Sequence, residues 1–328
     1  MIILKKMYKY SVIVFLIFCS CIKPSNIQVN KTRLIWNNAN HNAFTSLTSY
    51  NNYLYCAFRE ASSHHSYDGG IRIIRSKDTE NWEDVTLITI PEEDLRDPKF
   101  IVSNNNLSII FVSRTETKHF SYSYTTEDGE KWKFENREED TWRWSAAEFE
   151  GEIYSVGYSS KDKKGSIYTA EKGKSWKPVK QNFFPDVESY PNETALFFKS
   201  DGTSYALVRQ DKKSKTALIG SSKPPYNNWQ WKDLGTRIGS PSGILVNDSL
   251  ILGCVRLYFP TRTSLVWIHP EEGTIKEAAK LPSGGDTGYA SIVKYNGKHY
   301  VSFNSSRNTE KRTSIYLSEF AIKNDGKN

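Results

Sequence analysis

Arginines, carboxylic acids and a tyrosine recur at the edges of short strand-like stretches throughout this 328-residue chain. Carboxyl groups act as general acids and bases, and guanidinium groups bind a planar carboxylate through forked hydrogen bonds. A fold that brings these stretches together could therefore hold and cleave an acidic molecule. The candidate residues are His41, Asn42, Arg59, Glu60, Asp68, Arg96, Asp97, Arg143, Glu148, Glu193, Arg209, Arg256, Arg262, Asp286 and Tyr289.

Three turns that end in tryptophan divide these stretches into repeats. Each has a Ser or Thr and an acidic residue two positions later, at 76–82, 126–132 and, in degenerate form, 169–176. An Asp in such a turn caps backbone N–H groups, and the tryptophan packs between neighbouring sheets. Repeats of tens of residues indicate a propeller, a solenoid or an array. The 13% aromatic content and two methionines favour strands.

The turns resemble the Asp box of the sialidase superfamily, S-x-D-x-G-x-x-W, although the first two are one residue shorter. In that superfamily the boxes are scaffold elements on the rim. Strand clusters at about 41–90, 96–137, 141–182, 189–235, 239–281 and 286–322 then predict an all-β fold, a six-bladed β-propeller with four-stranded antiparallel blades. Because the innermost strands of a propeller line a central funnel, the candidate residues should meet there.

Three segments resemble the catalytic stretches of sialidases, in the same order along the chain. Residues 56–76 imply Asp68 as acid/base, residues 192–209 imply Glu193 as base with Arg209 as a carboxylate ligand, and residues 288–292 imply Tyr289 as nucleophile. A tyrosine with a pKa near ~10 reacts poorly until an adjacent carboxylate takes its proton. We therefore expect the Tyr289 and Glu193 oxygens to lie roughly 2.6–3.2 Å apart.

The resemblance fails at the first of three carboxylate-binding arginines. Sialidases have an Arg-Ile-Pro-like segment where this chain has His41 followed by Asn-Ala-Phe. Arg59 or Arg96 is the candidate replacement. For the third arginine both Arg256 and Arg262 lie near the expected place, and Arg262 is preferred because it precedes the strand-like run 263–268.

The predicted function is an exo-acting retaining glycoside hydrolase that removes a terminal acidic sugar of the sialic acid type from a glycan. The predicted catalytic residues are Asp68, Tyr289 and Glu193. The predicted substrate-binding residues are Arg59, Glu60, Arg96, Asp97, Arg209, Arg256, Arg262, His41 and Asp286. We expect a monomer without a cofactor, and no metal site, because the pair His64 and His65 lacks a second ligand cluster with zinc-like spacing.

Other readings of the same residues stay open. A uronic-acid polysaccharide lyase could use His41 or Tyr289 as base, and a surface glycan-binding protein needs no catalysis. The run Arg96-Asp97-Pro98 also resembles a motif of five-bladed fructosidase and arabinosidase propellers, whose Asp stabilises the transition state; here Asp97 is kept as an auxiliary funnel residue. Individually, arginines can form ion pairs between blades, Asp68 can cap a turn, and Tyr289 can be a core residue.

The N-terminal segment is typical of an export signal. Three lysines precede the apolar run 10–18, which is too short to span a bilayer, and Cys19-Ser20-Cys21 follows. This resembles a bacterial lipoprotein signal, and it implies a signal peptide over 1–21, a lipidated Cys21, a tether over 22–33 and a propeller over 34–323. The protein is expected on the outer membrane, held by lipid only. Charges of both signs alternate along the chain, so no nucleic-acid partner is expected.

Overall fold

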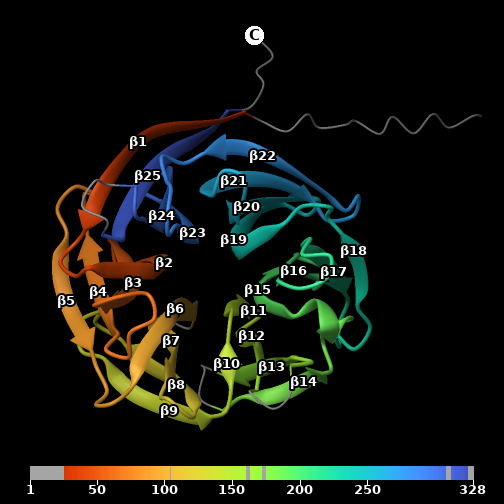
Figure 1. Cartoon of the computed structure of the whole chain (residues 1–328), viewed down its shortest axis with the longest axis horizontal. Coiled ribbons are helices and arrows are strands. Elements are labelled where there is room, and N and C mark those ends of the chain that lie inside the picture. Colours follow the sequence, from red (N-terminus) through yellow and green to blue (C-terminus); the bar gives the residue numbers. More distant parts are fainter. Residues whose placement is uncertain (1–25, 104, 160–162, 172–174, 308–311, 324–328) are drawn as a thin grey trace, which may run out of the picture.

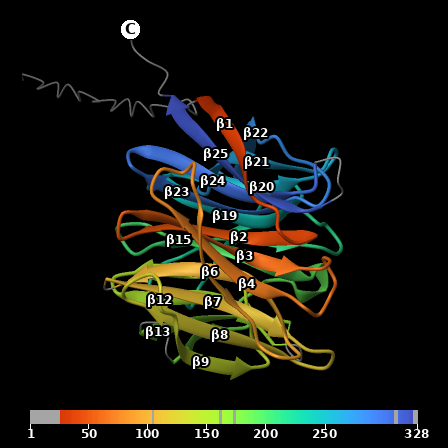
Figure 2. The ribbon, with the colours of Figure 1, turned by 90° about the vertical axis from the view of Figure 1, so that its left-hand side faces the viewer.

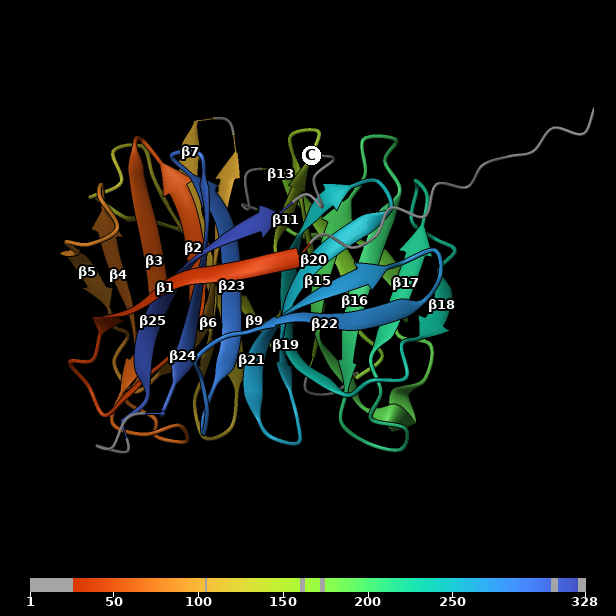
Figure 3. The ribbon, with the colours of Figure 1, turned by 90° about the horizontal axis from the view of Figure 1, so that it is seen from above.

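The computed structural model describes residues 26–103, 105–159, 163–171, 175–307 and 312–323, which form six antiparallel sheets around a central axis (Figure 1). Figures 2 and 3 show this ring from two edges. The predicted six-bladed, all-β propeller is confirmed. Within these residues the only helical turn is η1 (Val187–Ser189), and no helix there is long and apolar enough to cross a membrane.

Each blade follows the chain from the axis to the rim. Blade 1 contains β2 (His41–Tyr50), β3 (Tyr53–Ala61), β4 (Gly70–Ser76) and β5 (Glu83–Ile88), and blade 2 contains β6 (Asp94–Ser103), β7 (Asn106–Arg114), β8 (His119–Thr126) and β9 (Lys133–Glu139). Blade 3 contains β10 (Trp142–Arg143), β11 (Ala147–Phe149), β12 (Glu152–Tyr158), β13 (Ser166–Glu171) and β14 (Lys177–Gln181). Blade 4 contains β15 (Pro191–Phe198), β16 (Ser204–Gln210), β17 (Leu218–Ser222) and β18 (Gln230–Asp233), and blade 5 contains β19 (Ile238–Asn247), β20 (Leu250–Leu257), β21 (Arg262–His269) and β22 (Thr274–Lys280).

Blade 6 combines the two ends of the described chain. It contains β23 (Gly288–Tyr295), β24 (Lys298–Ser305), β25 (Ser314–Lys323) and, as its outer strand, β1 (Asn26–Trp36). The pairing of β1 with β25 runs from Asn26 opposite Lys323 to Trp36 opposite Ile315, and Figure 3 shows β1 lying across the outside of the ring. The predicted tether over 22–33 is therefore wrong from Asn26 onward, because Ile27 and Val29 pack against the core between blades 5 and 6.

Apolar clusters between neighbouring blades form the core. The cluster between blades 1 and 2 includes Tyr55, Ile73, Leu107 and Phe111, all buried. Similar clusters fill the other spaces between blades. The core is thus divided into wedges, and its rigidity fixes the innermost strands relative to one another.

The Asp-box turns have the predicted scaffold role. Asp78 Oδ1 accepts hydrogen bonds from the backbone N–H groups of Glu80 and Asn81, both at 2.8 Å. Asp128 Oδ1 accepts two equivalent bonds at 2.8 Å, and these bonds lower its pKa to about 2. Part of the third turn, residues 172–174, lies outside the described residues.

A β-bulge at one level of the innermost strands positions the funnel side chains. In β23, Gly288 pairs with Asn304 and Ser291 with Ser302, so β23 has one extra residue. The same shift occurs in β2, β6, β15 and β19. The first bulge residue has a positive φ in four blades: Phe44 at 65°, Asp97 at 54°, Ser240 at 45° and Tyr289 at 48°. Left-handed backbone at non-glycine residues is uncommon and concentrates at functional sites.

Cys56 and Cys254 are free and fully buried, in different core clusters. Burial raises the pKa of both thiols far above the ordinary value. We expect a thiol reagent to modify neither residue in the native protein and both after denaturation. If either thiol reacted in the folded protein as fast as an exposed thiol does, this packing would be contradicted.

Candidate active site

A tyrosine and a glutamate from different blades meet in the funnel. The Tyr289 hydroxyl, on β23, donates a hydrogen bond to Glu193 Oε1, on β15, at 2.7 Å. The predicted contact is confirmed, although the two residues lie 96 positions apart. Both belong to the bulges of their strands, which turn the two side chains toward each other.

Glu193 is held in its ionised form. Its Oε2 accepts from Arg209 Nη1 at 2.8 Å and from the Ser240 backbone N–H at 2.6 Å. Burial acts to raise the pKa of Glu193, but Arg209, the Tyr289 hydroxyl and Arg256 outweigh burial and lower it. The carboxylate therefore stands ready to accept the phenol proton at neutral pH.

Tyr289 is a protonated phenol in this arrangement. Burial first, and then the charges of Glu193 and Asp97, raise its pKa well above the ordinary value. Its ring lies 5.4 Å from the Arg256 guanidinium carbon, and its backbone carbonyl accepts from the Thr45 hydroxyl at 2.7 Å. Because Glu193 accepts its hydrogen bond, the phenol can lose its proton to that carboxylate as a new bond forms at the tyrosine oxygen.

Arg256, and not Arg262, faces the funnel. Arg256 donates through Nε to the carbonyl of Thr287, while Nη2 has no hydrogen-bond partner among the described residues and lies 3.8 Å from Asp286 Oδ1. Arg262 instead forms a forked pair with Glu277, 2.8 Å at both contacts. The preference for Arg262 is wrong, because Arg262 begins β21, one strand farther from the axis than the β20 strand that carries Arg256.

Three arginines surround one buried carboxylate near the end of the funnel where the innermost strands begin, here called the mouth. Asp94 accepts from Arg59 Nε at 2.7 Å, from Arg96 Nη2 at 2.7 Å and from Arg114 Nε at 2.8 Å. Burial alone would raise the pKa of Asp94, but the charges of Arg96 and Arg59 and the bond from Arg114 lower it. Arg59 is fully buried in this cluster, so it does not replace the missing first arginine beside Tyr289. The Arg96 guanidinium lies 5.4 Å from the centre of the Phe44 ring, which in turn packs against the Tyr289 ring.

Asp68 and Glu60 make local contacts rather than facing Tyr289. Asp68 is exposed, and its carboxylate accepts from the Ser62 backbone N–H at 3.2 and 3.3 Å. Burial acts to raise the pKa of Asp68, but the hydrogen bonds from Ser66 and Ser62 together outweigh burial and lower it. Glu60 pairs with Arg72 at 2.8 Å. The turn-capping alternative therefore describes the Asp68 contacts, and Glu60 belongs to a cross-strand ion pair.

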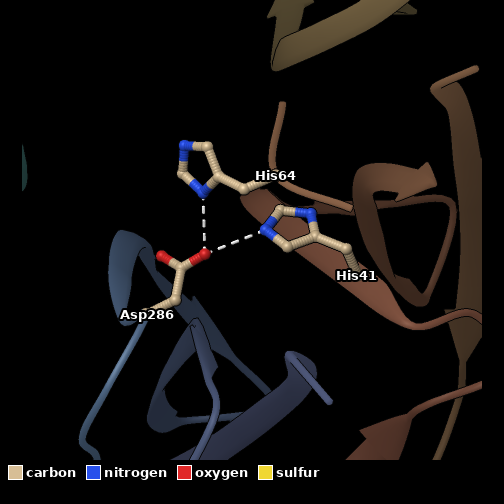
Figure 4. A group of neighbouring side chains, drawn as sticks. All are labelled: His41, His64 and Asp286. Atoms are coloured by element: carbon tan, nitrogen blue, oxygen red, sulfur yellow. Dashed lines mark hydrogen bonds and ion pairs between the residues drawn. The ribbon is translucent and has the colours of Figure 1, made fainter. Parts of the chain in front are cut away.

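His41, His64 and Asp286 form a compact group at the mouth (Figure 4). Asp286 Oδ2 lies 2.9 Å from His41 Nε2 and 2.7 Å from His64 Nδ1. Arg59 Nη1 lies 3.2 Å from His41 Nδ1. A guanidinium group only donates, so His41 Nδ1 accepts and the ring proton sits on Nε2.

These hydrogen bonds determine whether His41, His64 and Asp286 could bind a metal ion. The ligand atoms of the three residues lie within 4.8 Å of one another. A neutral imidazole binds a metal through the nitrogen that has no proton. Since His41 Nε2 carries its proton toward Asp286, the arrangement is that of a hydrogen-bonded relay, and it suits a metal ion poorly.

A small cavity of about 60 Å³ lies beside Tyr289 and Glu193. Asp97, Lys99 and Trp144 line this cavity together with Glu193 and Tyr289. Burial raises the pKa of Asp97 and lowers that of Lys99. A cavity of this size can hold water but not a sugar ring.

The remaining candidates have structural contacts. Arg143 is buried between the rings of Tyr168 and Trp176 and pairs with Glu138 at 2.6 Å. Glu148 accepts the Gly151 backbone N–H at 2.7 Å in a turn. Asn42 Nδ2 donates to the carbonyls of Ala39 and Thr313, and Arg209 also pairs with Asp211.

The sequence matches no protein-family model and none of the curated proteins. A protein of unknown function from Dyadobacter fermentans matches the structure with a TM-score of 0.78, over 91% of this chain and 100% of its own, at 17% identity. The α-L-arabinofuranosidase of Fusarium graminearum, bound to an iminosugar inhibitor, gives 0.70 over 90% and 98% at 10% identity. Trypanosoma rangeli sialidase with the inhibitor DANA gives 0.62 over 85% of this chain at 13% identity.

The chain has the six-bladed propeller fold of the sialidases. It spans about half of the T. rangeli sialidase chain, 55%, and nearly all of the arabinofuranosidase. At such low identities the likeness extends to the fold alone. The roles of individual residues therefore rest on the contacts around Tyr289.

Two residues with central contacts were not among the predicted site residues. Asp94 binds three arginines, and His64 was considered only as half of a metal-like pair. Asp94, His41 and Asp286 hold equivalent positions in three blades. Each lies two residues before the last paired residue that precedes the bulge of its innermost strand. Aligning the innermost strands on that phase would have identified Asp94, whereas the direction of the His64 ring depends on its loop.

Proposed function

We propose that this protein is a retaining exo-glycoside hydrolase that uses Tyr289 as nucleophile and Glu193 as its base. The observation that carries the proposal is the 2.7 Å hydrogen bond from a half-buried phenol to an ionised carboxylate. A tyrosine nucleophile is the sialidase exception to the two-carboxylate rule for glycosidases. The Tyr289 oxygen attacks the anomeric carbon while its proton moves to Glu193, and water then releases the sugar from the tyrosine.

We propose a terminal sugar that carries a carboxylate as the substrate. Arg256 supports this, because its guanidinium carbon lies 5.4 Å from the centre of the Tyr289 ring and its Nη2 has no hydrogen-bond partner among the described residues. A neutral phenol approaches an anionic sugar more easily than a carboxylate nucleophile would. Arg209 contributes less to the binding of a substrate carboxylate, because Glu193 and Asp211 already neutralise its charge.

Aryl glycosides of sialic and uronic acids, incubated with the purified protein from acidic to neutral pH, test the proposal. We expect release of the aryl group and a first sugar product with the anomeric configuration of the substrate, as read by proton NMR. Inversion of configuration, or binding without cleavage of any glycoside, would contradict the proposal. Unsaturated products that absorb in the near ultraviolet would instead identify a lyase.

The lyase alternative draws limited support from His41. Its two ring nitrogens contact Arg59 and Asp286, at 3.2 and 2.9 Å. A general base needs a free lone pair within reach of the substrate proton. Of the two bases first considered, His41 has both ring nitrogens engaged, and Tyr289 could act as a base only after its proton had passed to Glu193.

The choice between the two arginines leads to a direct comparison. We expect Arg256→Leu to raise KM for an acidic glycoside on the order of 10- to 100-fold, the range for a lost charge-assisted contact of about 1.5–3 kcal/mol. Arg262→Leu should stay within about twofold, because its partner Glu277 lies away from the funnel. Steady-state kinetics on both variants would show the opposite ranking if Arg262 bound the substrate.

We further propose that the chain is exported and lipid-anchored through Cys21. The support is the lysine-rich start, the short apolar run and the cysteine pair in the sequence; residues 1–25 lie outside the described residues. Labelling with a fatty-acid analogue in a bacterial host should mark the wild type and fail for Cys21→Ser. Equal labelling of both would exclude Cys21 as the site.

A further inference from the structure

We propose that His64, held by Asp286, is the proton donor and acceptor of the reaction at Tyr289. The resemblance to sialidases implied Asp68 in this role, and the assignment to His64 rests on the proposed hydrolase function.

The hydrogen bonds set the tautomer of His64. Hydrogen bonds from His41 and His64 lower the pKa of Asp286, although burial opposes them. An ionised carboxylate only accepts, so His64 must donate from Nδ1 over 2.7 Å. Its Nε2 then has a free lone pair when the ring is neutral and a proton to give when it is charged. Figure 4 shows Nε2 on the side of the ring away from Asp286.

His64 and Tyr289 both contact one aromatic ring. The Phe44 ring is 4.5 Å from the Tyr289 ring and 5.5 Å from the His64 ring, edge-on to each. The His64 side chain is 34% exposed and Tyr289 is half-buried, whereas Glu193 is buried behind Tyr289. A sugar ring attacked by Tyr289 from below would therefore have its outer, leaving oxygen on the His64 side.

The arginine cluster around Asp94 fixes the loop that carries His64. Arg96 Nη2 donates to the His64 carbonyl at 3.2 Å, and Arg114 Nη2 donates to the His65 carbonyl at 3.1 Å. Arg59 donates to the carbonyls of Ser63 and Ser66. The titratable and charged groups near His64 and its partner Asp286 are His41, His65, Arg59, Arg96, Arg114 and Arg256.

The proton balance of the reaction closes with these residues. In the first step the Tyr289 oxygen bonds to the anomeric carbon, its proton goes to Glu193, and the proton of His64 Nε2 goes to the departing oxygen. In the second step neutral His64 takes a proton from water, whose oxygen bonds to the anomeric carbon. Tyr289 leaves and recovers its proton from Glu193, so the net change is hydrolysis.

Leaving-group dependence tests the role of His64. We expect His64→Gln to lose on the order of 10²- to 10⁴-fold in kcat/KM on alkyl glycosides and far less on nitrophenyl glycosides, whose leaving groups need no proton. Added azide should restore turnover and yield a glycosyl azide of retained configuration. His65→Gln, on the same loop, is the matched control. It should change neither the kcat/KM on the two substrate classes nor the response to azide. Equal losses on both substrate classes, or azide rescue in Asp68→Asn or Asp97→Asn instead, would overturn the assignment.

Nitrogen NMR of the imidazoles in the full-length protein gives a readout that does not need activity. We expect neutral His64 to carry its proton on Nδ1 and His41 on Nε2, and the Asp286→Asn variant to lose the His64 preference. If neutral His64 in the wild type carried its proton on Nε2, the assignment of His64 and Asp286 as a proton-transfer pair would be overturned, independently of any activity. If the tautomer is as expected and no glycoside is hydrolysed, the proposed function fails while the pairing with Asp286 stands.

Discussion

Replacing Tyr289 by phenylalanine should abolish turnover and leave the fold intact. The ring keeps its contacts with Phe44 and Arg256, and only the attacking oxygen is lost. Removing a nucleophile costs several orders of magnitude in kcat, so we expect a loss on the order of 10³-fold or more. Glu193 keeps its bonds from Arg209 and Ser240, which limits the loss of stability to about 1 kcal/mol.

Tyr295 provides the matched control for this experiment. It lies on the same strand, is buried, and donates through its hydroxyl to the carbonyls of Asn52 and Lys77 at 2.8 and 2.9 Å. Tyr295→Phe should cost a similar small amount of stability and retain turnover. Kinetics and thermal unfolding of both variants separate catalysis from packing. A Tyr289→Phe enzyme with near-normal turnover would refute the covalent mechanism.

Asp94→Asn should be the most destabilising single substitution among the ionisable residues near the mouth. The carboxyl group is fully buried and compensates three guanidinium groups. Breaking a buried ion pair by removing one partner costs about 3–5 kcal/mol, because uncompensated charge remains. Urea unfolding should therefore show a lower midpoint with an unchanged slope. Asp84→Asn, which affects an exposed partner of Arg72, should change the free energy of unfolding by less than about 1 kcal/mol.

The stability of the wild type and of Asp94→Asn can also be compared as a function of pH. Since the pKa of Asp94 is lower in the folded state, its ionisation stabilises the fold fully above the unfolded value of ~3.9. That stability is lost as the pH falls through the folded pKa. We therefore expect the wild type to approach Asp94→Asn in stability below about pH 4. A difference that stays constant down to strongly acidic pH would mean that packing, not charge, makes Asp94 important.

The blade count and the central pair were accessible from the sequence for physical reasons. Asp-box turns need an Asp, a Ser or Thr and a Trp at fixed spacing, so they identify the blades directly. The pairing of Tyr289 with Glu193 followed from the resemblance to sialidases together with the funnel geometry. The bulge that orients both side chains has no distinct signature in residue type, since Phe44, Asp97, Ser240 and Tyr289 differ in chemistry.

The errors arose where position depends on a distant partner. The β1 strand could not be recognised as part of a blade, because β25, with which it pairs, lies almost the whole chain away. Arg256 and Arg262 are six positions apart, but one belongs to the second strand from the axis and the other to the third. Asp68 and His64 share one loop, and periodicity does not determine which loop side chain points inward.

The pairing of β1 with β25 also determines how the ring can come apart. Asn26 lies opposite Lys323, so a short peptide could join these two ends. A circular permutant that starts at His41 and carries residues 26–36 after Lys323 would build all six blades from consecutive hairpins and keep every strand pair. It would lose the covalent connection between the outer strand of blade 6 and the innermost strand of blade 1. In the natural order, blades 1 and 6 cannot separate until β1 unpairs from β25; in the permutant they could part with all blades intact.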